Sequence, residues 1–217
     1  DIINVYGLTE ITPMGTASPW KGTIKPGTVG IPLPNTDLKI VDLDDPTKEL
    51  KQGEAGEILF KGPQVMKGYY KKPEETAAVL RDGWLHTGDI GFLDEDGYLT
   101  IVDRKKDMIV ASGFNIFPQE VDEVLMEHPR ILEACTIGVP DSYRGEAPKS
   151  YVVLKDGGTL SAEEIVEFCK KRLAPYKVPR QIEFIDELPK TSVGKILRRE
   201  VKELDRKKRE AGEAKSV

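Results

Sequence analysis

The chain has 217 residues, of which 39% are hydrophobic and 32% are charged, so it can bury a core and is not a disordered segment. Its formal net charge of −5 argues against a surface that binds nucleic acid. No apolar run approaches the roughly 20 residues that span a bilayer, and the cysteines and histidines share no zinc-ligand spacing.

Residues 1–102 are predicted to be rich in β-strands. Short runs of β-branched and aromatic residues are separated there by Gly, Pro and Asp, which favour turns. One helix is expected at about 74–80, because Pro73 is suited to the first turn of a helix. The expected strands lie at 38–41, 56–60 and 98–102.

After Arg104 the pattern changes to strands that alternate with helices. Pro118 starts a predicted helix over 118–127, and another helix opens at the capping box of Ser161 and Glu164. A last helix is expected from about residue 196 and ends in a solvated charged run. The expected strands lie at 108–111, 131–139, 150–154 and 182–185.

A dense charged run separates the two patterns, and we expect it to form a linker. The predicted fold class is α+β. The predicted organisation is an incomplete β-rich domain at 1–102, a hinge at 103–108, a small α+β domain at 109–205 and a charged tail at 206–217.

The segment Tyr-Gly-Leu-Thr-Glu at residues 6–10 contains groups that suit a nucleotide. Tyr6 can stack on a planar base. Thr9 can hydrogen-bond a phosphate oxygen, and Glu10 can hold Mg²⁺ through one oxygen. Gly7 lends the segment flexibility. Alone, such a segment is more often only a strand end and a turn.

Two glycine-containing segments carry further candidates. Asp89 ends a Thr-Gly-Asp sequence and can accept hydrogen bonds from a ribose diol, although a lone Gly-Asp is more often an Asx turn or a helix cap. Gly113 allows the backbone to approach a ligand closely, although an ordinary turn is the commoner role of such a glycine.

Lys195 follows Gly194 on a segment that we expect to be a mobile loop before a basic helix. Its ammonium group suits transient neutralisation of a phosphate or a carboxylate, whereas the simpler interpretation is a solvated surface lysine. The segment is not a phosphate-binding P-loop, because Ile196 follows the lysine and Pro189 stands where the first glycine should be.

In this order, the motifs resemble the C-terminal half of the acyl-adenylate-forming superfamily, which includes acyl-CoA synthetases, luciferases and the adenylation domains of peptide synthetases. The chain is most similar to the long- and medium-chain fatty acyl-CoA ligases, over essentially its whole length. The matching segments are Tyr-Gly-Leu-Thr-Glu at 6–10, Asp-Gly-Trp-Leu-His-Thr-Gly-Asp at 82–89, Asp-Arg-Lys-Lys-Asp-Met-Ile at 103–109, Ser-Gly-Phe-Asn-Ile at 112–116 and Leu-Pro-Lys-Thr-Ser-Val-Gly-Lys at 188–195.

The resemblance implies that the segment around Gly7 binds ATP. Tyr6 would pack on adenine, and Thr9 and Glu10 would bind the phosphates and Mg²⁺. Asp89 would hold the ribose hydroxyls with help from the nearby Arg104.

The resemblance also implies roles around the hinge and beyond it. Asp103 would be the hinge, and Gly113 would line the path by which the pantetheine arm of coenzyme A arrives. Lys195 would bridge the attacking carboxylate and the ATP phosphates. His86 stands where the family often has arginine, and we expect little effect.

The implied function is part of a fatty acid–CoA ligase, whose partners are a fatty acid, ATP and CoA. The implied fold is a distorted β-barrel subdomain followed by a small mobile α+β domain. The chain starts at Asp1 without a methionine and lacks the family's phosphate loop, which indicates a fragment that is inactive alone.

Other interpretations remain. A relative could load a carrier-protein thiol, act as another acid–thiol ligase or make an adenylate for another purpose, and a non-catalytic binding module could reuse the fold. Two distant cysteines in apolar surroundings favour reduced thiols and a cytoplasmic protein. No transmembrane segment is expected, while peripheral membrane contact and oligomerisation of the longer protein stay open.

Overall fold

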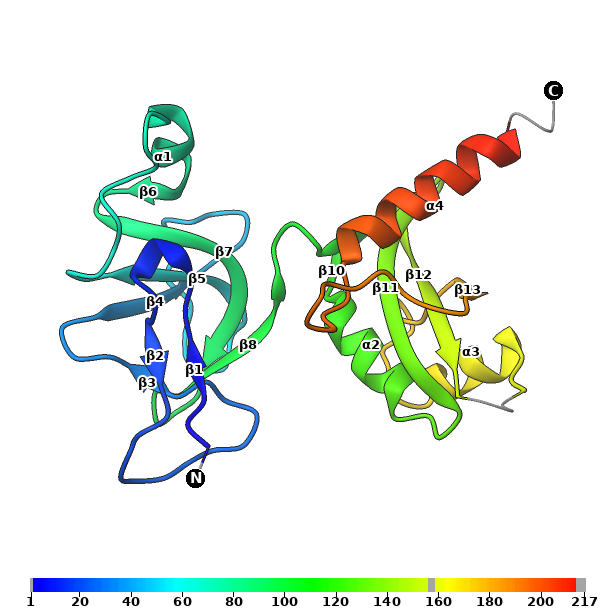
Figure 1. The fold of residues 1–217 in the computed structure, drawn as a ribbon, viewed down its shortest axis with the longest axis horizontal. Coiled ribbons are helices and arrows are strands. Elements are labelled where there is room, and N and C mark those ends of the chain that lie inside the picture. Colours follow the sequence, from blue (N-terminus) through cyan, green and yellow to red (C-terminus); the bar gives the residue numbers. More distant parts are fainter. Residues whose placement is uncertain (1, 156–158, 214–217) are drawn as a thin grey trace. The chain divides into compact units, whose positions relative to one another are not determined.

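The computed structural model describes residues 2–155 and 159–213. It divides into two compact units, Asp1–Lys106 and Asp107–Val217 (Figure 1). The division lies inside the stretch where the sequence pattern changes. Residues 214–217 of the expected charged tail lie outside the described residues.

The N-terminal unit contains two antiparallel sheets. One has the order β1-β2-β3, and the other has the order β4-β5-β7-β6, with β8 also paired to β7. The elements are β1 (Val5–Tyr6), a 3-10 helix (Thr9–Ile11), β2 (Thr16–Ala17), β3 (Ile31–Pro32), β4 (Asp37–Val41), β5 (Gly56–Lys61), α1 (Pro73–Val79), β6 (Leu80–Arg81), β7 (Trp84–Leu93) and β8 (Leu99–Arg104).

The larger sheet of this unit is open. Within the described residues, no strand pairing joins β4 to the opposite side of the sheet, so the expected distorted barrel does not close. The buried core includes Ile58 and Phe60 of β5 and Leu85 of β7. The sequence pattern missed β7 because polar residues and Gly88 interrupt its alternation; pairing with β5 and β8 on its two sides extends the strand through them.

The C-terminal unit is built on one mixed sheet with the order β10-β9-β12-β11, to which β13 adds in parallel beside β12. The elements are β9 (Ile109–Ala111), β10 (Phe114–Ile116), α2 (Pro118–Met126), β11 (Ile131–Asp141), β12 (Gly145–Leu154), α3 (Ala162–Lys170), β13 (Gln181–Phe184) and α4 (Arg198–Glu213). The two units together confirm the predicted α+β class.

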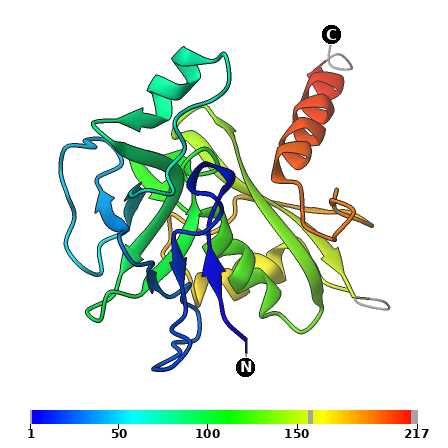
Figure 2. The ribbon, with the colours of Figure 1, turned by 60° about the vertical axis from the view of Figure 1, so that its left-hand side comes forward.

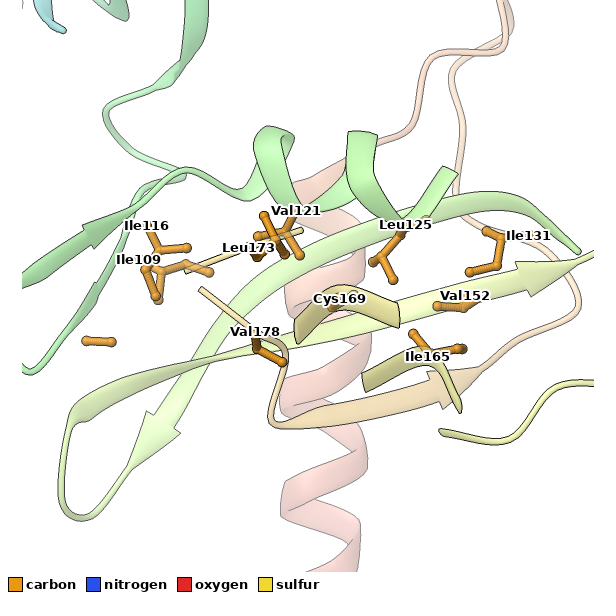
Figure 3. Packing of buried hydrophobic residues seen from close by; sticks show 12 residues of the cluster. Ile109, Ile116, Val121, Leu125, Ile131, Val152, Ile165, Cys169, Leu173 and Val178 are labelled. Atoms are coloured by element: carbon orange, nitrogen blue, oxygen red, sulfur yellow. The ribbon is translucent and has the colours of Figure 1, made fainter. Parts of the chain in front are cut away.

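Helices cover both faces of this sheet. Side chains alternate between the faces of a strand, so Val152 of β12 packs with α2 and α3, as Figure 3 shows. Its neighbours Tyr151 and Val153 belong to the other core, to which Val201 of α4 contributes. The sheet therefore separates two hydrophobic clusters.

Local signals set several helix ends. Ser161 Oγ accepts a hydrogen bond from the amide of Glu164 over 3.2 Å, and the amide of Ser161 donates to Glu164 Oε2 over 2.8 Å, which completes the predicted capping box. Pro118 occupies the first turn of α2, as expected. The last helix begins at Arg198 and runs unbroken to Glu213, so the tail expected from residue 206 begins within α4 (Figure 2).

We find no helix in the described ranges that is long and apolar enough to cross a membrane.

Candidate functional site

Tyr6, Asp89 and Arg104 meet in the N-terminal unit although they are distant in sequence. Asp89 on β7 and Arg104 on β8 are direct partners in the antiparallel ladder. The Tyr6 hydroxyl donates to Asp89 Oδ2 over 2.6 Å, and Arg104 Nε lies 3.5 Å from Asp89 Oδ1. Burial and, after it, the charge of Asp89 raise the pKa of Tyr6 well above its ordinary value, so the hydroxyl stays protonated and donates.

An open hollow of about 540 Å³ lies beside these groups, with Asp89, Arg104 and Glu10 among its lining residues. Its walls thus combine carboxylates with cationic side chains. A hollow with a few convergent polar groups is the usual form of a small-molecule site. The remaining lining residues are Leu8, Thr87, Gly88, Lys105 and Lys106.

Glu10 lies in the 3-10 helix that also contains Thr9. The Tyr69 hydroxyl donates to Glu10 Oε1 over 2.7 Å, and this hydrogen bond raises the pKa of Tyr69 to about 12. Tyr69 was not a sequence-based candidate, because 59 residues separate it from Glu10.

Gly7 has a packing role rather than the expected flexible one. A Cβ atom at this position would lie 1.7 Å from the carbonyl oxygen of Pro13. Any side chain would therefore displace the turn that carries Glu10.

The buried carboxylate of Glu57 holds the Gly88–Asp89 segment in place. Glu57 is 5% exposed, and its Oε1 accepts a hydrogen bond from the amide of Gly88 over 3.2 Å. Lys105 Nζ lies 3.0 Å from Glu57 Oε2, while the Lys105 amide donates to the carbonyl of Gly88 over 2.8 Å. His86 Nδ1 lies 3.6 Å from the same carboxylate. Sequence reasoning missed Glu57, although its place at the start of the apolar strand β5 was a signal. Buried acids are rarely unpaired, so an acid at such a position predicts a nearby partner.

Gly113 occupies the tip of a two-residue hairpin between β9 and β10. Ser112 and Gly113 both have positive φ, 52° and 81°, which suits a type I′ turn. No heavy atom lies within 4 Å of a Cβ built on Gly113, so the position is open on its surface. Phe114, the next residue, stacks on Tyr176 with ring centroids 4.7 Å apart.

Lys195 lies in the C-terminal unit, on the segment between β13 and α4. The segment is a small hairpin rather than an open loop, since Lys190 and Ile196 form an antiparallel bridge. The side chain of Lys195 is exposed, and its ammonium group makes no hydrogen bond or ion pair among the described residues. It can therefore approach an anionic group that arrives from solvent.

Asp103, the expected hinge, is buried within β8 and pairs with Ile90 of β7. The first residue of the C-terminal unit, Asp107, is bound to α4 through Lys202 over 3.1 Å. The site residues thus fall into two groups, six in the N-terminal unit and two in the C-terminal unit: Tyr6, Gly7, Thr9, Glu10, Asp89 and Arg104, and Gly113 and Lys195.

Two family models match the chain. Residues 1–70 match the AMP-binding enzyme model, and residues 120–195 match the C-terminal domain of AMP-binding enzymes.

Relatives agree with these matches. A long-chain-fatty-acid–CoA ligase of Bacillus subtilis is 56% identical over 93% of this chain, and this chain covers 36% of that protein. The chain thus spans about a third of the length of the curated relatives it matches.

Solved structures agree as well. ATP-bound MatB from Rhodopseudomonas palustris is 36% identical with a TM-score of 0.88, over 94% of this chain and 40% of that one. The o-succinylbenzoate CoA synthetase of Bacillus subtilis, with its acyl-adenylate intermediate, is 37% identical with a TM-score of 0.80, over 92% and 40%. The chain therefore belongs to the AMP-binding enzymes, and it corresponds to the C-terminal portion of the acyl-adenylate-forming superfamily.

Proposed function

We propose that this chain forms part of an AMP-forming fatty acid–CoA ligase. A carboxylate oxygen of the fatty acid attacks the α-phosphorus of ATP, acyl-AMP forms and pyrophosphate leaves. The sulfur of CoA then attacks the acyl carbon, the thioester forms and AMP leaves. The division helps because a carboxylate oxygen is a poor leaving group until it carries AMP.

The observation that supports this proposal most is the group beside the hollow in which Asp89 is hydrogen-bonded to Tyr6 and ion-paired with Arg104. In the proposal, the aromatic ring of Tyr6 packs against adenine, and Asp89 accepts hydrogen bonds from the ribose. Arg104 assists by holding the second oxygen of the Asp89 carboxylate, 3.5 Å from its Nε atom.

Thr9 and Glu10 are assigned to the ATP phosphates and their Mg²⁺. Glu10 fits this role, because its carboxylate lines the hollow and Mg²⁺ is commonly held by one or two carboxylates together with substrate phosphates. Bound there, Mg²⁺ would neutralise phosphate charge.

Gly113 and Lys195 are assigned to different steps. The open hairpin tip at Gly113 leaves room for the pantetheine arm of CoA. The exposed ammonium group of Lys195 would shield the meeting of carboxylate and phosphate during adenylation. The C-terminal unit would turn between the two steps, and we place the pivot after Lys105, whose ties to Glu57 and Gly88 hold it to the N-terminal unit.

The proposal includes residence in the cytoplasm. It is supported by Cys135 and Cys169, both buried and unpaired.

ATP–pyrophosphate exchange by the longer protein that carries this chain tests the function. We expect exchange that depends on a long-chain fatty acid, followed by release of acyl-CoA when CoA is added. The 217-residue chain alone should show no exchange. A binding site needs all of its convergent groups, and this chain spans only about a third of the length of its relatives. Transfer to a carrier protein but not to CoA would favour the carrier-loading alternative, and no exchange with any acid would favour a binding module.

A further inference from the structure

The segment that presents Lys195 is a closed hairpin with fixed ends, residues 189–197, which we call the lysine hairpin. The amide of Thr191 donates to the carbonyl of Lys195 over 2.8 Å, and the amide of Gly194 donates to the carbonyl of Thr191 over 2.9 Å. The amide of Lys195 itself donates to Thr191 Oγ1 over 3.1 Å. The backbone at Lys195 is therefore defined from within the hairpin.

One side chain fixes the incoming end of the hairpin. Lys190 Nζ lies 2.8 Å from Glu133 Oε1 of β11, and both side chains are partly buried. The second carboxylate oxygen, Glu133 Oε2, is buried and has no hydrogen-bond partner among the described residues. Lys190 is thus the cation that compensates this partly desolvated carboxylate.

A second side chain fixes the outgoing end. Arg198 Nη2 donates to Asp122 Oδ2 of α2 over 2.6 Å, and Arg198 Nε donates to the carbonyl of Thr136 over 3.1 Å. Asp122 Oδ1 in turn accepts the amide of Thr136 over 2.6 Å. Glu133 and Thr136 lie on the same strand, β11, so both ends of the hairpin are attached to one rigid element.

We propose that the pairs Lys190–Glu133 and Arg198–Asp122 form a clamp that positions Lys195 for the adenylation step. The inference rests on the proposed function, in which Lys195 acts only in that step. A lysine side chain is long and flexible, so its ammonium group reaches a defined point only if its backbone is fixed. A displacement of about 1 Å of a catalytic group can cost about 10²-fold in rate.

The clamp is not needed to attach α4 to the sheet, because α4 has other anchors. Asp205, 1% exposed, anchors α4 further along, because its Oδ1 lies 2.7 Å from Lys149 Nζ and accepts the hydroxyl hydrogen of Tyr151. Val201 also packs into the core beneath the helix. A variant of Asp205 therefore weakens α4 without touching the hairpin, and it provides a matched control for Arg198.

The two half-reactions of the longer protein test the clamp. In Arg198→Met we expect the maximal rate of ATP–pyrophosphate exchange to fall by about 10–100-fold, while thioester formation from supplied acyl-AMP and CoA changes less than about twofold. Arg198→Lys should recover part of the exchange rate, because it keeps the charge but loses the forked donor. Asp205→Asn should lower the melting temperature and leave the ratio of the two rates unchanged.

Equal slowing of both half-reactions in Arg198→Met would overturn the positioning role and leave only a structural one. An unchanged exchange rate in this variant, with an active parent, would overturn it as well. Loss of exchange in the parent itself would instead count against the proposed function.

Amide hydrogen exchange of the 217-residue chain gives a readout that needs no activity. We expect Arg198→Met to speed exchange at Thr191, Gly194 and Lys195 without speeding it in β12. Asp205→Asn should leave these three amides protected. Unchanged protection of the hairpin in Arg198→Met would overturn the clamp, whatever the parent enzyme does.

Discussion

The hydroxyl of Tyr6 donates a hydrogen bond of 2.6 Å to Oδ2 of Asp89, which lies 83 positions later in the chain. This bond fixes the carboxylate that we assign to the ribose. It also ties the Tyr6 side chain to Asp89, which lines the hollow, so the ring and the carboxylate are positioned together.

Tyr6→Phe in the longer protein should therefore raise the KM for ATP about tenfold, since a hydrogen bond to a charged group contributes about 1.5–3 kcal/mol and the ring is retained. Steady-state kinetics measures the change. Tyr98→Phe is the control, because the Tyr98 hydroxyl lies in the same unit but donates to the backbone carbonyl of Thr23, over 2.6 Å, rather than to Asp89. Equal effects of the two variants would contradict the role of Tyr6.

Local patterns predicted the local elements well. The capping box at Ser161, the proline at the start of α2 and the strands in apolar runs each depend on neighbouring residues, so the sequence contains their signal. The contact of Tyr6 with Asp89 depends instead on the pairing of β7 with β8 and on β1, which no local pattern reveals. Matched motifs indicated that the two residues share a site but not that they bond to each other.

Two expectations about the backbone were wrong, and each error has a physical cause. Gly7 suggested flexibility, whereas the close carbonyl of Pro13 is what demands glycine. Thr191 and Gly194 suggested an open loop, whereas their amides close the lysine hairpin. Small and polar residues permit turns of many kinds, and the hydrogen bonds within the hairpin hold this one together with the tertiary contacts of Lys190 and Arg198.

Gly113→Leu in the longer protein should slow thioester formation and spare adenylation, because a bulky side chain would obstruct the path of the CoA thiol. Gly97→Leu is the matched control, since Gly97 has φ of 80°, against 81° for Gly113, and nothing within 4 Å of a built Cβ. Both variants carry the same backbone strain, about 1 kcal/mol or more. A similar loss of thioester formation in Gly97→Leu would assign the effect to strain.

Limited proteolysis should cut first at the peptide bond after Lys106. Arg104 is paired within β8, the Lys105 amide is hydrogen-bonded to Gly88, and Asp107 is bound to Lys202. The bond after Lys106 joins the last residue of the N-terminal unit to the first residue of the C-terminal unit, so cleavage there separates the two units without cutting a strand of either. Mass spectrometry of the first tryptic fragments would locate the cut, and early cleavage inside β11 or β12 would contradict this division.

Lys195→Ala should slow adenylation by about 10²–10³-fold, the usual cost of losing one group that stabilises developing charge. Thioester formation from supplied acyl-AMP should remain nearly normal, because no phosphate chain needs shielding in that step. Lys207→Ala removes an exposed lysine of α4 that makes one weak ion pair of 3.8 Å with Glu203, and it should affect neither step. If Lys195→Ala slowed both steps equally, Lys195 would have a structural role rather than a role in adenylation.

The stability of the C-terminal unit should depend on pH through Asp122. Burial raises the pKa of Asp122 to about 7, with Arg198 and Thr136 opposing the shift. Cys135 is another titratable group that interacts with Asp122, and burial raises the pKa of that thiol to about 12, so it stays neutral. Arg198 Nη1 also lies 3.9 Å from Asp107 Oδ2, so this one guanidinium group interacts with the carboxylates of both Asp107 and Asp122.

Because the folded pKa of Asp122 lies above the ordinary value of 3.8, the folded chain holds a proton that the unfolded chain releases between these values. The stability due to this proton is fully present below pH 4 and is lost as the pH rises through about 7. The free energy of unfolding of the wild type, minus that of Asp122→Asn, should therefore fall by at most about 1.4 kcal/mol per pH unit over this window and level off above it. Urea unfolding followed by helical circular dichroism measures it, since both tryptophans, Trp20 and Trp84, lie in the N-terminal unit. A difference that rises with pH would show that Arg198 outweighs burial and keeps Asp122 ionised.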